Sequence, residues 1–190
     1  MRARPQAEPS AEVVVRAAGG DREAFADLYG AYSEDVARLC RRLLGAGAEA
    51  EDARSETFLR AGQALASYDR GRPFRRWLLA IAAHHCLDRL RRRQVEGRLF
   101  DAAELSELDL PLAGPTPLGL ALVRERSEAL HTALEALPPA QRAPLVLRYF
   151  AELPYDSIAE LLGVTSRDVG VLLYRAKARL RKGMREGEST

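Results

Sequence analysis

The side chains best suited to chemistry are His84, His85 and Cys86, which are adjacent and are all common metal ligands. Consecutive residues of a helix diverge by about 100°, so three neighbours cannot hold one ion as residues four apart can. The sequence also lacks a Ser/His/Asp arrangement, a glycine-rich phosphate loop and separated cysteine pairs. We therefore expect no active site, no metal and no cofactor. Stoichiometric zinc would instead support a metalloenzyme or a metal sensor.

The segment 155–180 has the spacing of a helix-turn-helix. Small Ala159 allows two helices to cross closely, and Gly163 can take the positive φ that ends the first helix. Val169 then packs the second helix against the first. An ordinary helical hairpin has the same pattern, so DNA binding is one of two interpretations of this segment.

The second helix of this segment has two candidate N-caps, Thr165 and Ser166. They are followed by Asp168, whose carboxylate suits the positive end of the helix dipole. In DNA-binding proteins a helix in this position usually enters the major groove.

Charge is distributed unevenly along the 190 residues, although the net charge of the whole chain is only +2. Residues 1–98 carry 18 basic and 14 acidic groups. Residues 99–123 carry no basic groups and four acidic ones, and residues 124–190 carry 11 basic and nine acidic groups. Any nucleic-acid binding must therefore come from local patches. A basic block, an acidic middle and a second basic block indicate two nucleic-acid-facing parts separated by a connector.

Two cysteines, Cys40 and Cys86, are too few for a disulfide-stapled secreted scaffold, so we interpret them as reduced core thiols. The N-terminus lacks the apolar core of a signal peptide, and the sequence contains no apolar run of 18 residues. We expect a cytoplasmic protein without membrane insertion.

Helical periodicity predicts an all-α fold of two small helical domains, because no segment shows convincing strand alternation. We predict a disordered tail over 1–20, an N-terminal helical domain over 21–98, a linker over 99–123 and a C-terminal helix-turn-helix domain over 124–190. The first domain should contain one long or two short helices over 21–44, one over 48–66 and one over 73–93. The second should contain an element leading to Pro138, one over 141–150 and the helix-turn-helix.

In the linker, acidic residues alternate with Leu and Ala, and several prolines and glycines prevent a continuous helix. We predict a flexible acidic connector that holds the two domains apart.

Taken in order, these features resemble the sigma-70 family of bacterial transcription initiation factors, and specifically its compact ECF (extracytoplasmic function) group. The similar stretches are 50–52, 56–61, 68–78, 87–92, 134–138, 157–164 and 175–176. The resemblance implies a non-enzymatic factor that binds the β and β′ subunits of core RNA polymerase. It also implies recognition of minus-10 and minus-35 promoter DNA, help in promoter opening, and an anti-sigma factor as a partner. The linker would thread through the polymerase, although a plain tether has the same composition.

The resemblance implies that a helix of the first domain docks on a coiled coil of the polymerase β′ subunit. It places Asp52, Glu56, Phe58 and Leu59 at that contact. Outward carboxylates suit a basic partner surface, although a solvated helix face carries the same residues.

The resemblance also implies a minus-10 site, in which unpaired bases stack on rings or guanidinium groups while arginines hold the backbone. The matching positions are Tyr68, Asp69, Arg70, Arg72, Arg75, Arg76, Trp77, His84, Asp88, Arg89 and Arg92. Trp77 has a second interpretation as a core residue, because its spacing matches Phe74 and Leu78.

For the minus-35 element, the resemblance points to the second helix of the helix-turn-helix. The matching positions are Ser166, Arg167, Val171, Tyr174, Arg175 and Lys177, with Arg181 and Lys182 as further phosphate contacts. Where relatives tend to have Gly-Thr-Val-Lys-Ser-Arg, this chain has Arg-Asp-Val-Gly-Val-Leu over 167–172. Two cations are lost, and one cation and one carboxylate are gained, so we expect weakened minus-35 binding.

Two alternatives share parts of this pattern. A helix-turn-helix transcriptional regulator would bind duplex DNA without polymerase, and a sigma-like protein could act mainly by protein binding. Binding to the polymerase β and β′ subunits and run-off transcription distinguish them from an initiation factor.

Overall fold

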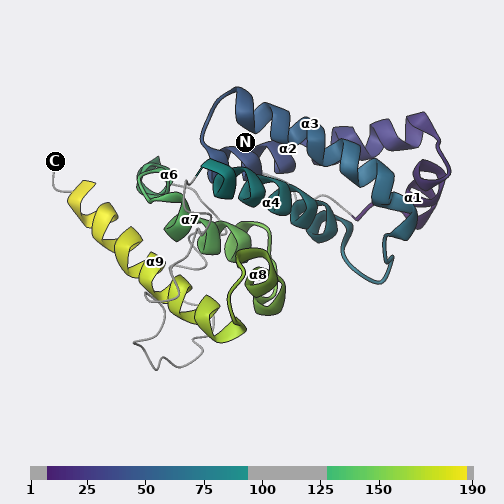
Figure 1. The fold of residues 1–190 in the computed structure, drawn as a ribbon. Coiled ribbons are helices and arrows are strands. Elements are labelled where there is room, and N and C mark those ends of the chain that lie inside the picture. Colours follow the sequence, from purple (N-terminus) through teal and green to yellow (C-terminus); the bar gives the residue numbers. More distant parts are fainter. Residues whose placement is uncertain (1–7, 94–127, 188–190) are drawn as a thin grey trace.

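The computed structural model describes residues 8–93 and 128–187, and every regular element in those ranges is a helix (Figure 1). This confirms the predicted all-α class. The predicted linker over 99–123 lies outside the described residues. None of the described helices is long and apolar enough to cross a membrane. The elements are α1 (Ala11–Ala18), α2 (Arg22–Leu44), α3 (Ala48–Ala64), η1 (Leu65–Ser67), α4 (Phe74–Arg93), α6 (Glu128–Glu135), α7 (Pro139–Leu145), η3 (Val146–Phe150), α8 (Tyr155–Leu162) and α9 (Ser166–Gly187).

The N-terminal half is built on α2, α3 and α4, each of which packs against the other two. Asp21 caps α2 by accepting hydrogen bonds from the backbone N–H groups of Glu23 and Ala24, at 2.9 and 3.1 Å. The helix then continues without a break to Gly45, whose φ of 91° is a backbone conformation that favours glycine. Of the two predicted possibilities for this segment, the single long helix is therefore correct.

A short helix lies where the sequence predicted a disordered tail. Ser10 caps α1 by accepting a hydrogen bond from Val13 N–H at 3.3 Å, and Val14 and Ala17 are buried. The prediction is wrong for residues 11–18, and residues 1–7 lie outside the described residues. Eight residues are too few to show a sustained helical period or to form a stable helix alone. The stability of α1 comes from its packing on α2 and η1.

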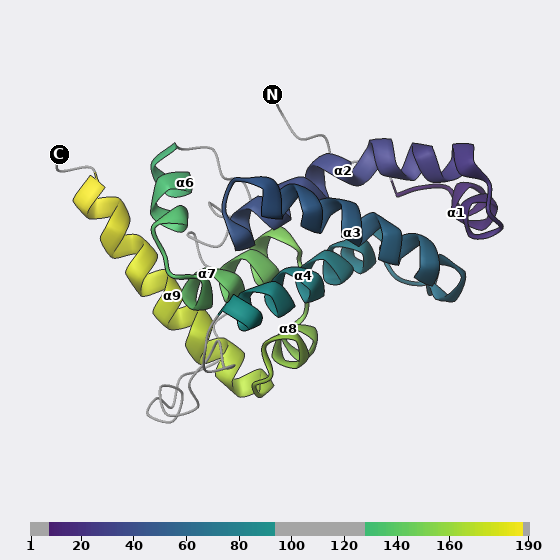
Figure 2. The same ribbon diagram turned by 45° about the horizontal axis from the view of Figure 1, so that its top comes forward.

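In the C-terminal half, the long helix α9 packs against α6, α7 and α8 (Figures 1 and 2). The turn between α8 and α9 follows the prediction. Gly163 is left-handed, with φ 70° and ψ 35°, while Ala159 and Val169 are buried at the crossing of the two helices.

Thr165 is the residue that caps α9. The Thr165 backbone N–H donates to the Asp168 carboxylate at 3.0 Å, and the Asp168 N–H donates to the Thr165 hydroxyl at 3.2 Å. This reciprocal arrangement satisfies donors at the start of the helix. Ser166, the other candidate, has a different role: its hydroxyl donates to Asp156 of α8 at 2.5 Å.

We expect Thr165→Val to lower the free energy of unfolding by about 1 kcal/mol, because it removes the side-chain cap without changing the residue's shape. Denaturant titration measures the change. Thr132→Val is the matched control, since Thr132 is exposed within α6. Equal losses in the two variants would contradict the assigned cap.

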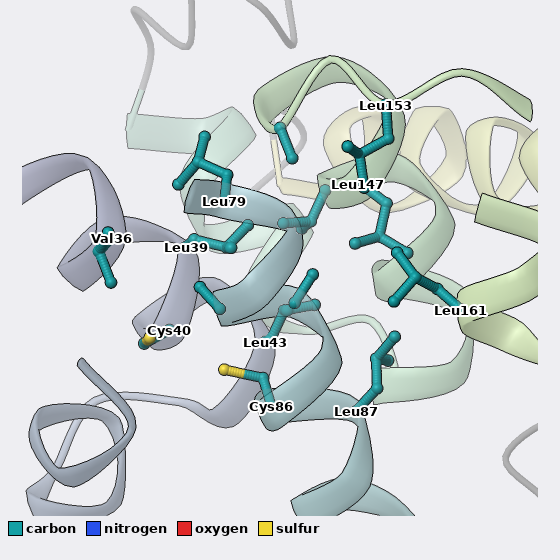
Figure 3. Close-up of a cluster of buried hydrophobic side chains, with 14 of the residues drawn as sticks. Val36, Leu39, Cys40, Leu43, Leu79, Cys86, Leu87, Leu147, Leu153 and Leu161 are labelled. Carbon is teal, nitrogen blue, oxygen red and sulfur yellow. The ribbon is translucent and has the colours of Figure 1, made fainter. Parts of the chain in front are cut away.

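The two halves are in direct contact. Figure 3 shows leucines of α4, including Leu79 and Leu87, beside Leu147, Leu153 and Leu161 of the C-terminal half, and all five are buried in one hydrophobic core. Helix α2 also contacts α7 and η3, and α4 contacts α8. The expectation that the halves are held apart is therefore wrong for this structure.

Candidate polymerase and nucleic-acid interfaces

A stripe of three residues follows one face of α3. Asp52, Glu56 and Leu59 are spaced by four and three residues, so they lie above one another on the helix. Asp52 is exposed and Leu59 is 58% exposed, which is unusual for a large apolar side chain. A 2.6 Å hydrogen bond from Arg60 lowers the pKa of Glu56, so this carboxylate stays charged. We call these three residues the α3 stripe.

Phe58 was predicted at the same contact, but it lies inside the N-terminal half. Its side chain is 5% exposed, and its ring centroid is 4.5 Å from that of Tyr29 on α2. One residue along a helix is a rotation of about 100°, which turns Phe58 from the stripe toward α2. Within this pair, the side chain of Tyr29 remains 38% exposed. Helical spacing alone did not identify Tyr29 as an aromatic residue at the surface.

The segment 68–73 joins η1 to α4, and we call it the α3–α4 loop. It closes on itself: the Tyr68 hydroxyl donates to the Arg72 carbonyl, and Asp69 accepts a hydrogen bond from Gly71 N–H at 2.9 Å. Arg72 lies 3.3 Å from Asp69, and their side chains are 78% and 66% exposed. Arg70 is also exposed. The loop thus has a defined shape and presents two guanidinium groups to solvent.

An aromatic cluster supports this loop at the start of α4. The centroid of Tyr68 lies 4.9 Å from Trp77 and 5.3 Å from Phe74, and Phe74 lies 5.2 Å from Tyr32 of α2. Trp77 is half-buried, so it combines features of both interpretations: its ring packs in the cluster while part of it reaches solvent. Neighbouring Arg76 is exposed.

The remaining predicted minus-10 residues lie on different faces of α4. His84 and Arg92 are exposed, and Asp88 pairs with Arg91 at 2.9 Å. Arg89 donates to His85 Nε2 at 3.0 Å and to the Glu49 carbonyl at 3.4 Å, so it joins α4 to α3.

His84 and His85 also illustrate the geometry that argued against a metal site. His84 is exposed, whereas His85 is buried beside Arg89. Burial, reinforced by the positive charge of Arg60 and Arg89, lowers the pKa of His85, so its neutral ring can accept the Arg89 hydrogen bond. Among the described residues, no three His, Cys, Asp or Glu side chains are grouped to hold a metal ion. Cys40 and Cys86 are buried thiols, as predicted.

Arg75, which was predicted to contact DNA, instead connects the two halves. It lies 2.6 Å from Asp35 of α2, donates to the Phe150 carbonyl at 3.2 Å and lies 3.5 Å from Glu152. Burial alone would raise the pKa of Asp35, but the hydrogen bonds and charges of Arg75 and Arg38 outweigh it and lower that pKa. The DNA contact of Arg75 was implied by the resemblance alone, and residues distant in sequence determine the contacts that it makes in this structure.

The ring of Phe150 lies against three arginines of the N-terminal half. Its centroid is 4.3 Å from the guanidinium carbon of Arg42, 5.4 Å from that of Arg75 and 5.8 Å from that of Arg38. These are distances at which a cation is attracted to a ring face. Burial, with the neighbouring arginines, lowers the pKa of Arg42 to about 10. We call this arrangement the Phe150 contact.

A second polar contact between the halves involves a buried arginine. Arg142 of α7 donates to the Leu43 carbonyl of α2 at 3.2 Å and to the Glu135 carbonyl at 3.1 Å. Arg91 of α4 donates to the Leu161 carbonyl of α8. Backbone carbonyls at helix ends need such donors, so these arginines satisfy polar groups at the boundary between the halves.

The predicted minus-35 residues are divided between the surface and the interior. Tyr174 is 52% exposed, Arg167 is exposed and Arg175 is half-buried. Lys177 is buried, with its Nζ 5.0 Å from the Tyr149 ring centroid, and burial lowers its pKa. Val171 is also buried, at 3% exposure. Neither side chain reaches the surface in this structure, because helical spacing gives a direction from the axis but not what packs there.

Comparisons with known proteins agree with this arrangement. Residues 28–96 match the family description "Sigma-70 region 2", and residues 127–180 match "Sigma-70, region 4". The chain is 32% identical to the ECF RNA polymerase sigma factor SigW of Bacillus subtilis, over 88% of this chain and 92% of SigW. It is 34% identical to the ECF RNA polymerase sigma factor SigD of Mycobacterium tuberculosis, over 93% of this chain and 84% of SigD.

A solved structure has the same fold. The sigma factor RpoE from Bartonella quintana, determined in complex with the anti-sigma factor NepR, superposes with a TM-score of 0.58 at 19% identity, covering 86% of this chain and 98% of that one. The chain therefore belongs to the ECF group of the sigma-70 family of RNA polymerase sigma factors, which are promoter-recognising transcription initiation factors and not enzymes.

Proposed function

We propose that the α3 stripe is the surface that binds the polymerase β′ subunit. Its support is the exposure of Leu59 at the end of a stripe that begins with the acidic residues Asp52 and Glu56, with Glu56 one helical turn before it. An exposed apolar residue flanked by charge is typical of a contact that is apolar at its centre and polar at its rim.

We also propose that the α3–α4 loop, with Arg76 and Trp77, captures unpaired bases of the minus-10 element. The observation that carries this proposal is the half-buried Trp77 ring within a rigid aromatic cluster, beside the exposed guanidinium groups of Arg70 and Arg72. A fixed ring gives a flipped base a surface to stack on, and the arginines supply phosphate contacts. Three other residues predicted at the minus-10 site, Arg75, Asp88 and Arg89, bond to protein groups. In this proposal they contribute by stabilising the fold.

For the minus-35 element, we propose contacts from Arg167, Tyr174 and Arg175 on α9. Burial of Lys177 removes one cation from this surface, which adds to the unusual sequence over 167–172. Each lost phosphate contact weakens DNA binding and reduces its dependence on salt. We therefore expect the minus-35 contact to be weaker than the minus-10 contact.

The two halves must separate for both contacts to form at once. The two elements are separate stretches of the duplex. The Phe150 contact and the hydrogen bonds from Arg75 and Arg142 hold the halves in one fixed relation, which limits how they can follow the duplex. We propose that residues 21–98 and 124–190 act as two domains that part along this boundary, with 99–123 as the connection.

Run-off transcription with purified core polymerase tests this assignment. The double variant Arg70→Ala with Arg72→Ala is expected to retain polymerase binding but to lose open complexes by about tenfold or more, because two phosphate contacts are removed. Arg22→Ala is the control, since Arg22 is an exposed arginine on α2, outside the loop. Full activity of the double variant would contradict the role of the loop.

We propose an anti-sigma factor as a further partner and the cytoplasm as the site of action. The fold likeness to RpoE, which was solved with the anti-sigma factor NepR, supports the first. The cytoplasm is proposed because bacterial DNA, on which a sigma factor acts, lies there. A protein that binds this chain and suppresses its run-off transcription is expected, and unregulated activity in the cells that produce it would contradict the proposal.

A further inference from the structure

Glu8, three residues before α1, contacts the N-terminal end of α4. The carboxylate of Glu8 accepts a hydrogen bond from the backbone N–H of Phe74 at 2.8 Å, although the two residues are 66 positions apart. Phe74 is the first residue of α4 and directly follows the α3–α4 loop. The first N–H groups of a helix have no partner within the helix, and a carboxylate there also interacts favourably with the helix dipole.

The helix that follows Glu8 is attached to the N-terminal half. Ser10 caps α1, Val14 and Ala17 of α1 are buried, and α1 packs on α2 and η1. Since η1 leads into the loop and α4 follows it, α1 and Glu8 contact the chain on both sides of the loop. The N-terminal segment therefore spans the base of the loop.

Glu8 is also linked to the aromatic cluster. It bonds to Phe74, whose ring centroid lies 5.3 Å from that of Tyr68, and the Tyr68 hydroxyl donates to the Arg72 carbonyl within the loop. Burial, with the negative charge of Glu8, raises the pKa of Tyr32 to about 12 and raises the pKa of Tyr68. Glu8 is therefore connected both to the start of α4 and to the ring that closes the loop.

We infer that Glu8 is a positioning residue for the α3–α4 loop: by capping α4 from the N-terminal segment, it holds the loop and Trp77 in the geometry that receives an unpaired base. This inference rests on the proposed function of the loop. It assigns a promoter-recognition role to a residue that precedes the matched region 2 segment, 28–96.

The test uses the full chain in two measurements. Trp77 is the only tryptophan, so its fluorescence and its quenching by acrylamide report directly on the loop without DNA. Binding of a dye-labelled single-stranded oligonucleotide, taken from the nontemplate strand of a promoter found by transcript mapping, reports on function. The variants are Glu8→Ala, Glu8→Gln and, as a matched change of charge on α1, Glu12→Ala.

We expect Glu8→Ala to increase acrylamide quenching of Trp77 and to weaken oligonucleotide binding about fivefold, the equilibrium change that corresponds to loss of one helix cap. Glu8→Gln retains an acceptor and should keep most of the affinity, and Glu12→Ala should match the wild type. Unchanged quenching in Glu8→Ala, or an equal change in Glu12→Ala, would overturn the inference. Increased quenching with unchanged oligonucleotide binding would retain the positioning role but refute the proposed function of the loop.

Discussion

Leu59→Asp is expected to weaken binding to core RNA polymerase by about 30-fold or more while the protein stays folded. The side chain is 58% exposed, so the change places no charge in the core. In the proposed complex, however, Leu59 would be buried against the partner, and a carboxylate there would be desolvated one helical turn from Glu56. Loss of an apolar residue that anchors an interface costs on the order of 2–4 kcal/mol, or about 30-fold to 1000-fold in affinity. Fluorescence anisotropy of labelled protein with core polymerase measures this loss.

Val15→Asp is the matched control for this prediction. Val15 is 43% exposed on α1 and receives the same change of size and charge outside the α3 stripe. Thermal unfolding of both variants verifies that they are folded. If Leu59→Asp binds polymerase as tightly as Val15→Asp does, the α3 stripe is not the docking surface.

Phe150→Leu is expected to open the molecule. The substitution keeps an apolar side chain but removes the ring that Arg38, Arg42 and Arg75 contact. Cation–π contacts that are not fully desolvated contribute about 0.5–1 kcal/mol each, so the loss of all three, about 1.5–3 kcal/mol, should shift the ratio of closed to open molecules by about tenfold to a hundredfold. Small-angle X-ray scattering should show a larger radius of gyration, and promoter binding should become tighter because less free energy is needed to separate the halves.

Tyr149→Leu provides the comparison, because Tyr149 is the adjacent aromatic residue but contacts Lys177 of α9 within its own half. It should alter the stability of the C-terminal half without changing the radius of gyration. An unchanged radius for Phe150→Leu together with unchanged promoter binding would show that the Phe150 contact does not control opening.

Local features of this protein were predictable from sequence because their causes lie within a few residues. The helix starts at Asp21 and Thr165 depend on side chains that bond to N–H groups two or three residues away. The turn at Gly163 depends on the freedom of one residue to adopt positive φ. The resemblance to sigma factors likewise depended on short stretches in a fixed order.

Contacts between distant segments were not predictable in the same way. The sequence placed Phe58 and Lys177 on binding surfaces, whereas packing against Tyr29 and Tyr149 buries them. It also predicted no structure for the segment that forms α1, whose stability comes from other helices. In each case the deciding neighbour is far away along the chain.

The sequence by itself determined the helical elements other than α1, the turn at Gly163 and the family, since hydrophobic period and capping chemistry act over one or two helical turns. Only the tertiary structure decided that Arg75 joins the halves through Asp35 and the Phe150 carbonyl, and that Glu8 caps α4. Long polar side chains can reach several different partners, and which of them lies within hydrogen-bonding distance depends on how the helices pack.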